Sequence, residues 1–105
     1  MAIYEQRTYQ IHVGRKGDLV ELYANVGWPL LEKHAEKLVG YFFGDIGAMN
    51  QLIHIWRFDD DADRRAFWAE FYADAGLMDF AAKLRPLLAA QENRLMLSAP
   101  WGPRP

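Results

Sequence analysis

The hydrophobic pattern of the chain alternates between two periods, and the order of those periods limits the folds that the chain can adopt. Period-two alternation, rich in aromatic and β-branched residues, predicts strands over residues 3–12, 38–43, 50–58 and 93–99. Apolar residues at helical spacing predict a first helix over 18–37 and, after 59–61, a second helical region that breaks at Pro86.

Local signals support this division of the chain. Asp18 is suited to cap the first helix, and Pro29 inside that helix predicts a kink near residues 27–28. The acidic run 59–61 suits the start of the second helical region, and Gly76 suits a helix end inside it. The order strand, helix, strand, strand, helix, strand predicts an α+β, ferredoxin-like βαββαβ domain with an antiparallel four-stranded sheet.

Length and composition indicate one folded domain over residues 1–105, with a proline-rich tail from about residue 100. The chain has 105 residues, 51% hydrophobic residues, a net charge of -2 with mixed signs, and no cysteine. No basic patch predicts nucleic-acid binding, and no apolar run is long enough to span a membrane. No secretion signal opens the chain, so we expect a cytoplasmic protein.

The sheet of such a domain has helices on one face only, and the third strand has apolar residues on both of its faces. We expect Ile53 and Ile55 to pack against the helices. The other set would then lie on the uncovered face together with Phe42: Leu52, His54, Trp56 and Phe58. Because soluble monomers rarely expose so large an apolar patch, we expect a homodimer through the sheet face, in the form of a dimeric α+β barrel.

Polar residues of the first and third strands are predicted to share one face of the sheet. The first strand contributes Glu5, Arg7 and Tyr9, which alternate along it, and the third contributes Asn50, His54 and Trp56. The first and third strands are neighbours in the centre of a ferredoxin-like sheet. We therefore expect a small-molecule pocket between the sheet and the dimer partner, with Phe42 also in its wall.

Each of these residues has both a chemical and a structural interpretation. His54 suits a general acid or base, with Tyr9 and Glu5 as catalytic partners. Arg7 suits a carboxylate or oxyanion, Asn50 a carbonyl, and Trp56 a stacked ring. Alternatively, Glu5 and Arg7 form a structural ion pair, His54 is a satisfied buried histidine, and the aromatic residues pack an interface. The sequence leaves these alternatives open.

Motifs for metals, cofactors and several enzyme classes are missing. The three histidines have no metal-ligand spacing, and no axial-ligand motif supports haem binding at His34. We therefore predict no metal and no cofactor. The sequence also has no phosphate-binding loop, dinucleotide fingerprint or serine-hydrolase elbow.

Several segments resemble the NIPSNAP family. They are Tyr4-Glu5-x-Arg7-Thr8-Tyr9, Leu38-Val39-Gly40-x-Phe42, Gly47-x-x-Asn50-x-x-x-His54-x-Trp56-x-Phe58, the acidic helix start with Arg65, and the ending from Gln91 to Pro100. The resemblance covers residues 3–100, and the Asn–His–Trp spacing is its most specific part. The chain departs from the family in having Gln6 where an apolar residue is usual.

The resemblance implies a ferredoxin-like domain in the dimeric α+β barrel group. Eukaryotic members are linked to mitochondria, vesicle traffic and mitophagy signalling, but no transit segment carries those roles to this chain. Related barrels include cofactor-free monooxygenases, isomerases and haem-degrading enzymes. The function expected is small-molecule binding, with a cofactor-free oxygenase or isomerase as its catalytic form. The alternative is a non-catalytic regulatory or protein-interaction dimer, so whether the protein is an enzyme stays open.

Overall fold

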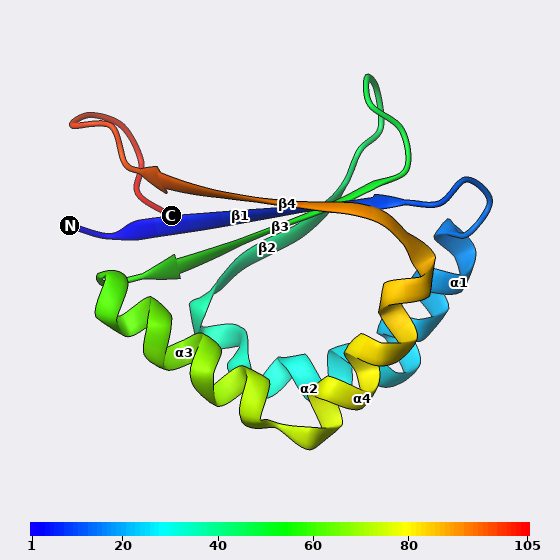
Figure 1. Cartoon of the computed structure of the whole chain (residues 1–105). Coiled ribbons are helices and arrows are strands. Elements are labelled where there is room, and N and C mark those ends of the chain that lie inside the picture. The colour runs from blue at the N-terminus through cyan, green and yellow to red at the C-terminus, as the bar shows by residue number, and fades with distance from the viewer.

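The computed structural model describes residues 1–105, and its helices all lie on one face of a single curved sheet (Figure 1). The strands are β1 (Ile3–Ile11), β2 (Leu38–Phe43), β3 (Gln51–Phe58) and β4 (Leu88–Leu97). Their order is β2-β3-β1-β4, and each neighbouring pair is antiparallel. The predicted α+β, ferredoxin-like arrangement is confirmed, although β4 begins five residues earlier than the pattern indicated.

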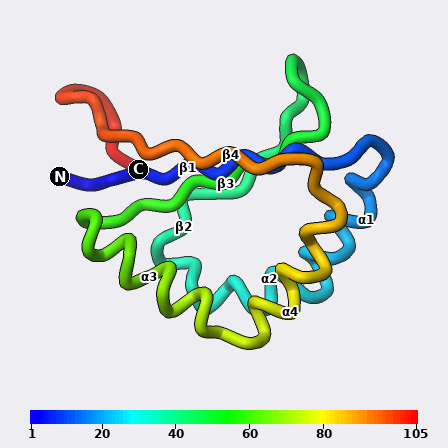
Figure 2. Tube along the Cα trace, in the orientation of Figure 1, coloured from blue at the N-terminus to red at the C-terminus, as the bar shows by residue number.

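Each helical region consists of several pieces rather than one helix. The first contains α1 (Lys16–Leu22), the π-helical turn η1 (Tyr23–Gly27), α2 (Trp28–Leu31) and the 3-10 turn η2 (Glu32–Lys37). The second contains α3 (Asp61–Ala73), α4 (Ala75–Leu84) and the 3-10 turn η3 (Arg85–Leu87). Together the pieces form an arc beneath the sheet (Figure 2).

Aspartate side chains cap the two long helices. The Asp60 carboxylate accepts a hydrogen bond of 2.7 Å from the backbone N–H of Asp63, and the Asp74 carboxylate accepts one of 3.2 Å from Leu77. The predicted acidic start of α3 is thereby confirmed. Two other expectations are wrong. Asp18 lies in the first turn of α1 and binds Arg15, and Gly76 lies in the first turn of α4, where Asp74 ends α3 and caps α4 at once.

The predicted irregularity near residues 27–28 is confirmed as the π-helical turn that ends at Gly27. Gly27 lies under the ring of Phe80 from α4, and a Cβ at Gly27 would come within 2.5 Å of that ring. Glycine is therefore required here for close helix packing rather than for an unusual backbone angle. A wider turn of this kind is often found beside functional sites.

The predicted faces of the third strand are reversed in the structure. Trp56 and His54 lie beneath the protein's own helices, with Leu52 and Phe58, and each of these four residues is buried. Ile53 and Ile55 lie on the uncovered face and are half-buried. The aromatic residues of β3 pack on Trp68 and Phe67 of α3, with ring centroids 5.5 Å apart for Trp56 and Trp68.

The neighbouring strand explains why the faces are reversed. In the register, Ile53 is opposite Thr8 and Ile55 is opposite Gln6, whereas Leu52 is opposite Tyr9. The face with the isoleucines therefore carries Gln6 and Thr8 on the adjacent central strand, whereas the helices cover the face that carries Tyr9 and the buried Glu5 and Arg7. Phe42, predicted to join Trp56, pairs with Ile53 and lies half-exposed on the uncovered face.

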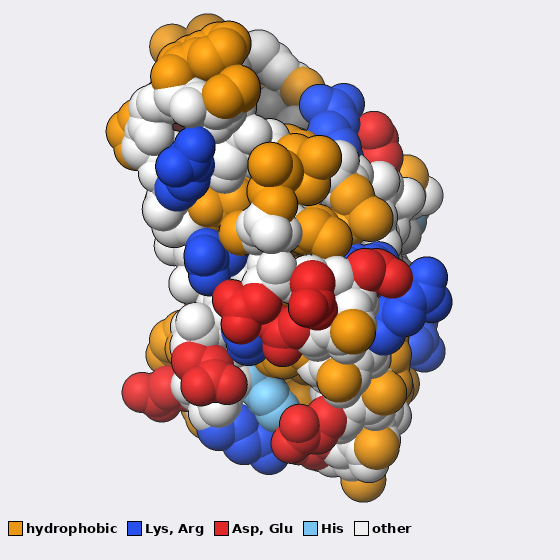
Figure 3. Space-filling model, turned by 90° about the vertical axis from the view of Figure 1, so that its left-hand side faces the viewer, with side chains coloured by type: hydrophobic (Ala, Val, Ile, Leu, Met, Phe, Trp, Pro, Cys, Tyr) orange, Lys and Arg blue, Asp and Glu red, His pale blue; other side chains and the backbone are white.

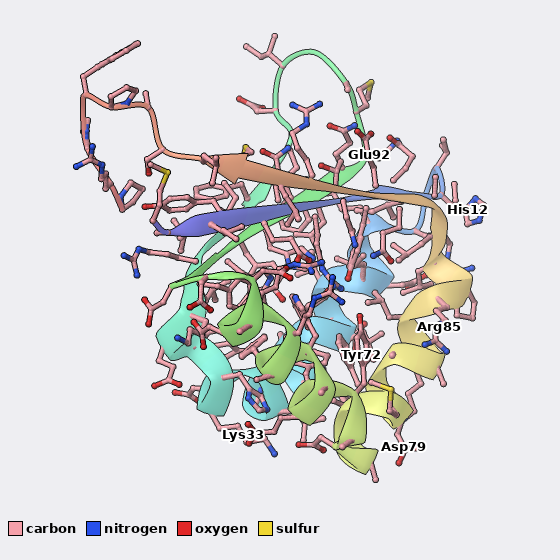
Figure 4. All side chains as sticks on the ribbon, turned by 60° about the vertical axis from the view of Figure 1, so that its left-hand side comes forward. His12, Lys33, Tyr72, Asp79, Arg85 and Glu92 are labelled. Atoms are coloured by element: carbon pink, nitrogen blue, oxygen red, sulfur yellow. The ribbon has the colours of Figure 1, made fainter.

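The uncovered face lies between two projecting segments (Figure 1). The loop between β2 and β3 rises at one end, and the C-terminal tail folds over the other, close to the N-terminus. The tail buries Tyr4, whose hydroxyl donates a hydrogen bond of 2.9 Å to the Pro105 carbonyl. Glu92 of β4 stands on this face (Figure 4). The face is thus mixed, with Phe42, Ile53 and Ile55 on β2 and β3 and the polar Gln6, Thr8, Glu92 and Arg94 on β1 and β4.

Charges of both signs are mixed over the end of the molecule where α3 begins, and hydrophobic side chains gather above them towards the tail (Figure 3). Asp61 forms one of the exposed ion pairs of this region, with Arg65 over 2.7 Å. None of the helices is long and apolar enough to cross a lipid bilayer.

Candidate binding site between the sheet and the helices

The polar residues expected to cluster do meet, but beneath the protein's own helices rather than at a partner's sheet. Glu5, Arg7 and Tyr9 point to the helix side of β1, and the register sets Arg7 opposite His54 and Glu5 opposite Trp56 on β3. All five residues are buried within one chain. The pocket predicted between the sheet and a dimer partner is therefore replaced by one inside the monomer.

Glu5 is fully buried and has a partner for each of its carboxylate oxygens. Nε of Arg7 donates to one oxygen over 2.5 Å. Nε of Arg64 donates to the other over 2.5 Å, and the indole N–H of Trp68 donates to the same oxygen over 3.2 Å. Two guanidinium groups and an indole thus hold this carboxylate.

The environment of Glu5 keeps it ionised. Burial alone would raise the pKa of the Glu5 carboxyl, but the hydrogen bonds and charges of Arg7 and Arg64 outweigh burial and hold its pKa below the ordinary value. A carboxylate so fully engaged is poorly suited to accept a proton from a substrate. Of the two interpretations open from the sequence, the structural ion pair fits Glu5.

Arg7 joins this ion pair to the aromatic side chains of α3. Its guanidinium lies over the Trp68 ring, 3.7 Å from the centroid, and its Nη1 donates to the Tyr72 hydroxyl over 3.2 Å. Burial alone would lower the pKa of Arg7, but its bonds to Glu5 and Tyr72 more than offset burial, and its pKa is raised. With Arg64 nearby, two cations surround one carboxylate, so the cluster has an excess of positive charge.

His54 accepts a hydrogen bond rather than presenting two free nitrogens. The indole N–H of Trp56 donates to Nδ1 of His54 over 2.7 Å. Because an indole nitrogen can only donate, Nδ1 must be unprotonated, and the proton of the neutral ring is assigned to Nε2. The imidazole is held between the ring of Tyr41, stacked at 4.7 Å, and the edge of Tyr9 at 4.8 Å.

The same surroundings keep His54 neutral. Burial, followed by the charge of Arg7, lowers the pKa of His54 to about 3. At neutral pH its ring is therefore a hydrogen-bond donor through Nε2–H. This state favours polarising or binding an oxygen atom over the role of general base.

The Nε2–H of His54 has no partner in the protein. This atom is buried, and nothing in the structure accepts its proton. Buried donors are satisfied in nearly all proteins, by protein groups, water or ligands. His54 is one of the residues that line a cavity of about 100 Å³.

Most of the 18 residues that line the cavity are hydrophobic. Arg7, His54 and Tyr9 form its polar wall, and the rings of Trp56, Trp68 and Phe71 form much of the rest. Tyr72 near the end of α3 and Arg85 at the start of η3 are also lining residues (Figure 4). Burial raises the pKa of Tyr9, Tyr23 and Tyr41, so these phenols are also neutral donors.

Two of the predicted ligand-binding residues lie elsewhere. Asn50 sits in the loop before β3 with a positive φ of 57°, and its carbonyl accepts the backbone N–H of Ile11 over 2.7 Å. Its side chain does not line the cavity. Phe42 is on the opposite face of the sheet. It follows Tyr41, which lines the cavity, and successive residues of a strand point to opposite faces.

Sequence reasoning missed several residues of the site. Trp68, Tyr72 and Arg64 are not among the predicted site residues, although the Trp68 indole N–H and Nε of Arg64 donate to Glu5 and the Tyr72 hydroxyl accepts from Arg7. A signal was available, because a buried Glu5 and Arg7 pair needs further partners and the second helix offers cations beside aromatic residues.

No group of three or more His, Cys, Asp or Glu side chains in the structure could hold a metal ion. His34, considered for haem by analogy, has a buried Nε2 without a partner, packed by the rings of Phe67 at 5.8 Å and Phe71 at 5.7 Å. It does not line the cavity.

Comparison with protein families gives a match over nearly the whole chain. The family model described as NIPSNAP matches residues 4–103, which include every residue of the cavity wall. The chain belongs to the NIPSNAP family. The resemblance stated from the sequence is confirmed.

Solved structures of NIPSNAP proteins have the same fold. A NIPSNAP family protein with unknown function from Agrobacterium tumefaciens is 34% identical, with 97% of this chain and 92% of that chain covered and a TM-score of 0.89. An uncharacterized NIPSNAP-like domain protein from Burkholderia xenovorans is 27% identical, with 98% and 90% covered and a TM-score of 0.89. Comparison with curated proteins gives no significant match.

The fold of this NIPSNAP domain also extends to more distant proteins. A putative antibiotic biosynthesis monooxygenase from Chloroflexus aurantiacus is 13% identical, with 98% of each chain covered and a TM-score of 0.62. At that identity the likeness shows the fold alone.

Proposed function

We propose that this NIPSNAP protein binds a small molecule in the cavity between its sheet and its helices, through an oxygen that accepts the Nε2–H of His54. One observation supports this proposal above the others: a neutral, buried imidazole donor without a partner points to an acceptor that the protein itself does not supply. Nearby Arg7 favours an acceptor that bears negative charge.

The aromatic wall defines the rest of the ligand. Rings from β3, α3 and η1 line the cavity together with Arg7 and His54. A flat or apolar body attached to the acidic oxygen would therefore contact aromatic rings on several sides. A cavity of about 100 Å³ suits a small group, such as a carboxylate on a single ring. Benzoate is therefore a suitable probe for the site.

The geometry supports binding better than acid–base catalysis. Glu5 is engaged by two arginines, His54 has its Nδ1 bound to Trp56, and burial raises the pKa of the lining tyrosines. The wall therefore supplies donors that stabilise an anion but no free base to create one. A cofactor-free oxygenase or isomerase would need a substrate that enters already ionised.

A calorimetric titration of the purified protein with benzoate at pH 7 tests the proposal. We expect saturable binding, weakened at least tenfold in His54→Asn, because the hydrogen bond to a charged group contributes about 1.5–3 kcal/mol. The Asn oxygen can still accept the indole N–H of Trp56, so the fold is kept, while the donor at the position of Nε2 is lost because the shorter amide does not reach it. Absence of binding at millimolar benzoate would mean that the cavity holds only water.

Oxygen uptake separates the catalytic form from simple binding. We expect an enolisable aromatic ketone, added to the protein at pH 7, to consume dioxygen no faster than in buffer. Uptake that requires His54 and stops in His54→Asn would instead favour the oxygenase.

The uncovered sheet face supports a separate proposal, pairing with a second copy of the chain. Ile53, Ile55 and Phe42 are neighbours on the β2–β3 half of this face, and Phe42 is half-exposed. We expect sedimentation to show a dimer at micromolar concentration and Ile55→Lys to give a monomer. The control Val13→Lys, in an exposed turn, should leave the dimer intact.

A further inference from the structure

A second apolar hollow lies beside the cavity, between the first helical region and β2. It has a volume of about 540 Å³, and all nine residues that line it are hydrophobic. Its rim is exposed to solvent through Val20, Trp28 and Phe43, which are 44%, 39% and 42% exposed. We call this hollow the α1–β2 groove. Three large side chains left this open around a hollow indicate a site for an apolar partner.

The groove and the cavity share a wall. Tyr23 of η1 and Tyr41 of β2 line both spaces, and their rings meet edge-on with centroids 5.6 Å apart. Tyr41 also stacks on the His54 ring at 4.7 Å. One layer of aromatic rings therefore separates the open groove from the imidazole whose donor has no partner.

Tyr23, one of the two residues of the shared wall, lies in an irregular part of the backbone. Tyr23 begins the π-helical turn η1, in which the helix is wider than an α-helix. Such a turn changes the direction of the side chains that it carries, and a change of the Tyr23 side-chain rotamer would join the two spaces.

The chemistry of the two spaces differs and is complementary. The groove has no charged lining residue, whereas the cavity is lined by Arg7 and Arg85 together with His54. A ligand that fills both needs an alkyl chain at one end and a single acidic, hydrogen-bond-accepting group at the other. A medium-chain carboxylate meets both requirements.

We propose that the cavity and the α1–β2 groove form one binding tract for an amphiphilic acid, with its carboxylate at His54 and Arg7 and its alkyl chain passing Tyr23 and Tyr41 into the groove. This inference rests on the proposed function, because the carboxylate end occupies the same cavity. It adds the class of ligand and the path of its chain.

Calorimetry with a series of straight-chain acids tests the tract. Butyrate, hexanoate, octanoate and decanoate are titrated into the wild-type protein and into Ala24→Trp, which fills the groove from an exposed lining position. The matched control is Ala82→Trp, an exposed helix position outside both spaces. Affinity should rise by up to about fourfold for each methylene in the wild type and the control. In Ala24→Trp the rise should be lost, with butyrate and benzoate unaffected.

His54→Asn locates the acidic end, and it should weaken decanoate and benzoate by the same factor. A gain in affinity with chain length that persists in Ala24→Trp overturns the proposal of a tract. Decanoate binding that is insensitive to His54→Asn but lost in Lys16→Gln also overturns it, because the carboxylate would then lie at the rim, where Lys16 stands 4.5 Å from the Phe43 ring. Binding of benzoate through His54 with no gain along the series removes the tract alone. Failure of every acid to bind removes the proposed function with it.

Discussion

The indole N–H of Trp56 donates to Nδ1 of His54 over 2.7 Å, and this bond fixes which imidazole nitrogen carries the proton. Both residues come from β3, two positions apart, and both are buried under α3 and the first helical region. The bond leaves Nε2 of a neutral imidazole as a buried donor that has no partner in the protein.

Two substitutions of His54 separate its two nitrogens. In His54→Asn the side-chain oxygen replaces Nδ1 as acceptor for Trp56, whereas His54→Gln places its amide near Nε2 and leaves the buried indole N–H unpaired. We expect His54→Gln to lose about 1–3 kcal/mol more stability than His54→Asn. Urea denaturation followed by tryptophan fluorescence measures the difference. Equal stability of the two variants would show that the indole bond contributes little.

The lowered pKa of His54 predicts a dependence of stability on pH. Its pKa is about 3 in the folded protein, against 6.5 for the free side chain. Between these values the unfolded chain binds a proton that the folded protein does not. The free energy of unfolding should therefore fall as pH drops below 6.5, by about 1.4 kcal/mol per pH unit from this group.

Denaturation at pH 7.5, 6.0 and 5.0 tests this dependence, with His54→Asn as the control. The variant should lack the His54 contribution, so the stability difference between the two proteins should narrow as pH falls. Glu5 acts in a separate window. Because its folded pKa is lowered, its contribution is lost only as pH falls below its ordinary value of 4.5. A constant difference between pH 7.5 and 5.0 would contradict the neutral, buried His54.

The buried ion pairs of Glu5 should matter far more than an exposed one. Glu5→Gln leaves Arg7 and Arg64 without their carboxylate, and we expect a loss of about 3–5 kcal/mol in the free energy of unfolding. Glu92→Gln, which removes an exposed pair with Arg94, should change it by less than about 1 kcal/mol. Similar effects of the two substitutions in urea denaturation would contradict the larger contribution of the buried ion pairs.

Sequence periodicity predicted the elements well but could not choose between the two faces of β3. Ile53 and Ile55 are as suited to a core as Leu52 and Phe58, so the third strand alone is ambiguous. The register resolves the ambiguity in the structure, because paired strands must agree on their buried face: Gln6 and Thr8 lie opposite the two isoleucines, and Tyr9 lies opposite Leu52. Glu5 and Arg7 share the buried face with Tyr9, so polarity along β1 alone does not identify that face, and the predicted site lies on the wrong side of the sheet.

The candidate site was predictable in part for the same reason. Alternation along β1 and β3 correctly grouped Glu5, Arg7 and Tyr9 with His54 and Trp56. The tautomer of His54 and the partners of Glu5 depend on distances across the core, which spacing along the chain does not contain. Asn50 failed because a positive φ in the loop turns its side chain away from the β3 pattern.

Two glycines in the first helical region should respond in opposite ways to alanine. Gly27→Ala places a Cβ within 2.5 Å of the Phe80 ring, so we expect a net loss of about 1–3 kcal/mol despite the better helix propensity of alanine. Gly17→Ala meets no atom within 4 Å and should gain about 0.5–1 kcal/mol. Thermal denaturation compares them. Stabilisation by Gly27→Ala would show that α4 packs less closely on η1.

The most direct test is proton–nitrogen correlation NMR of the histidine rings during a benzoate titration at pH 7. We predict that His54 shows a protonated Nε2 and an unprotonated Nδ1, and that the Nε2–H resonance shifts to saturation as benzoate binds. A His54 ring protonated on both nitrogens, or an Nε2–H signal unchanged at saturating benzoate, would contradict the account.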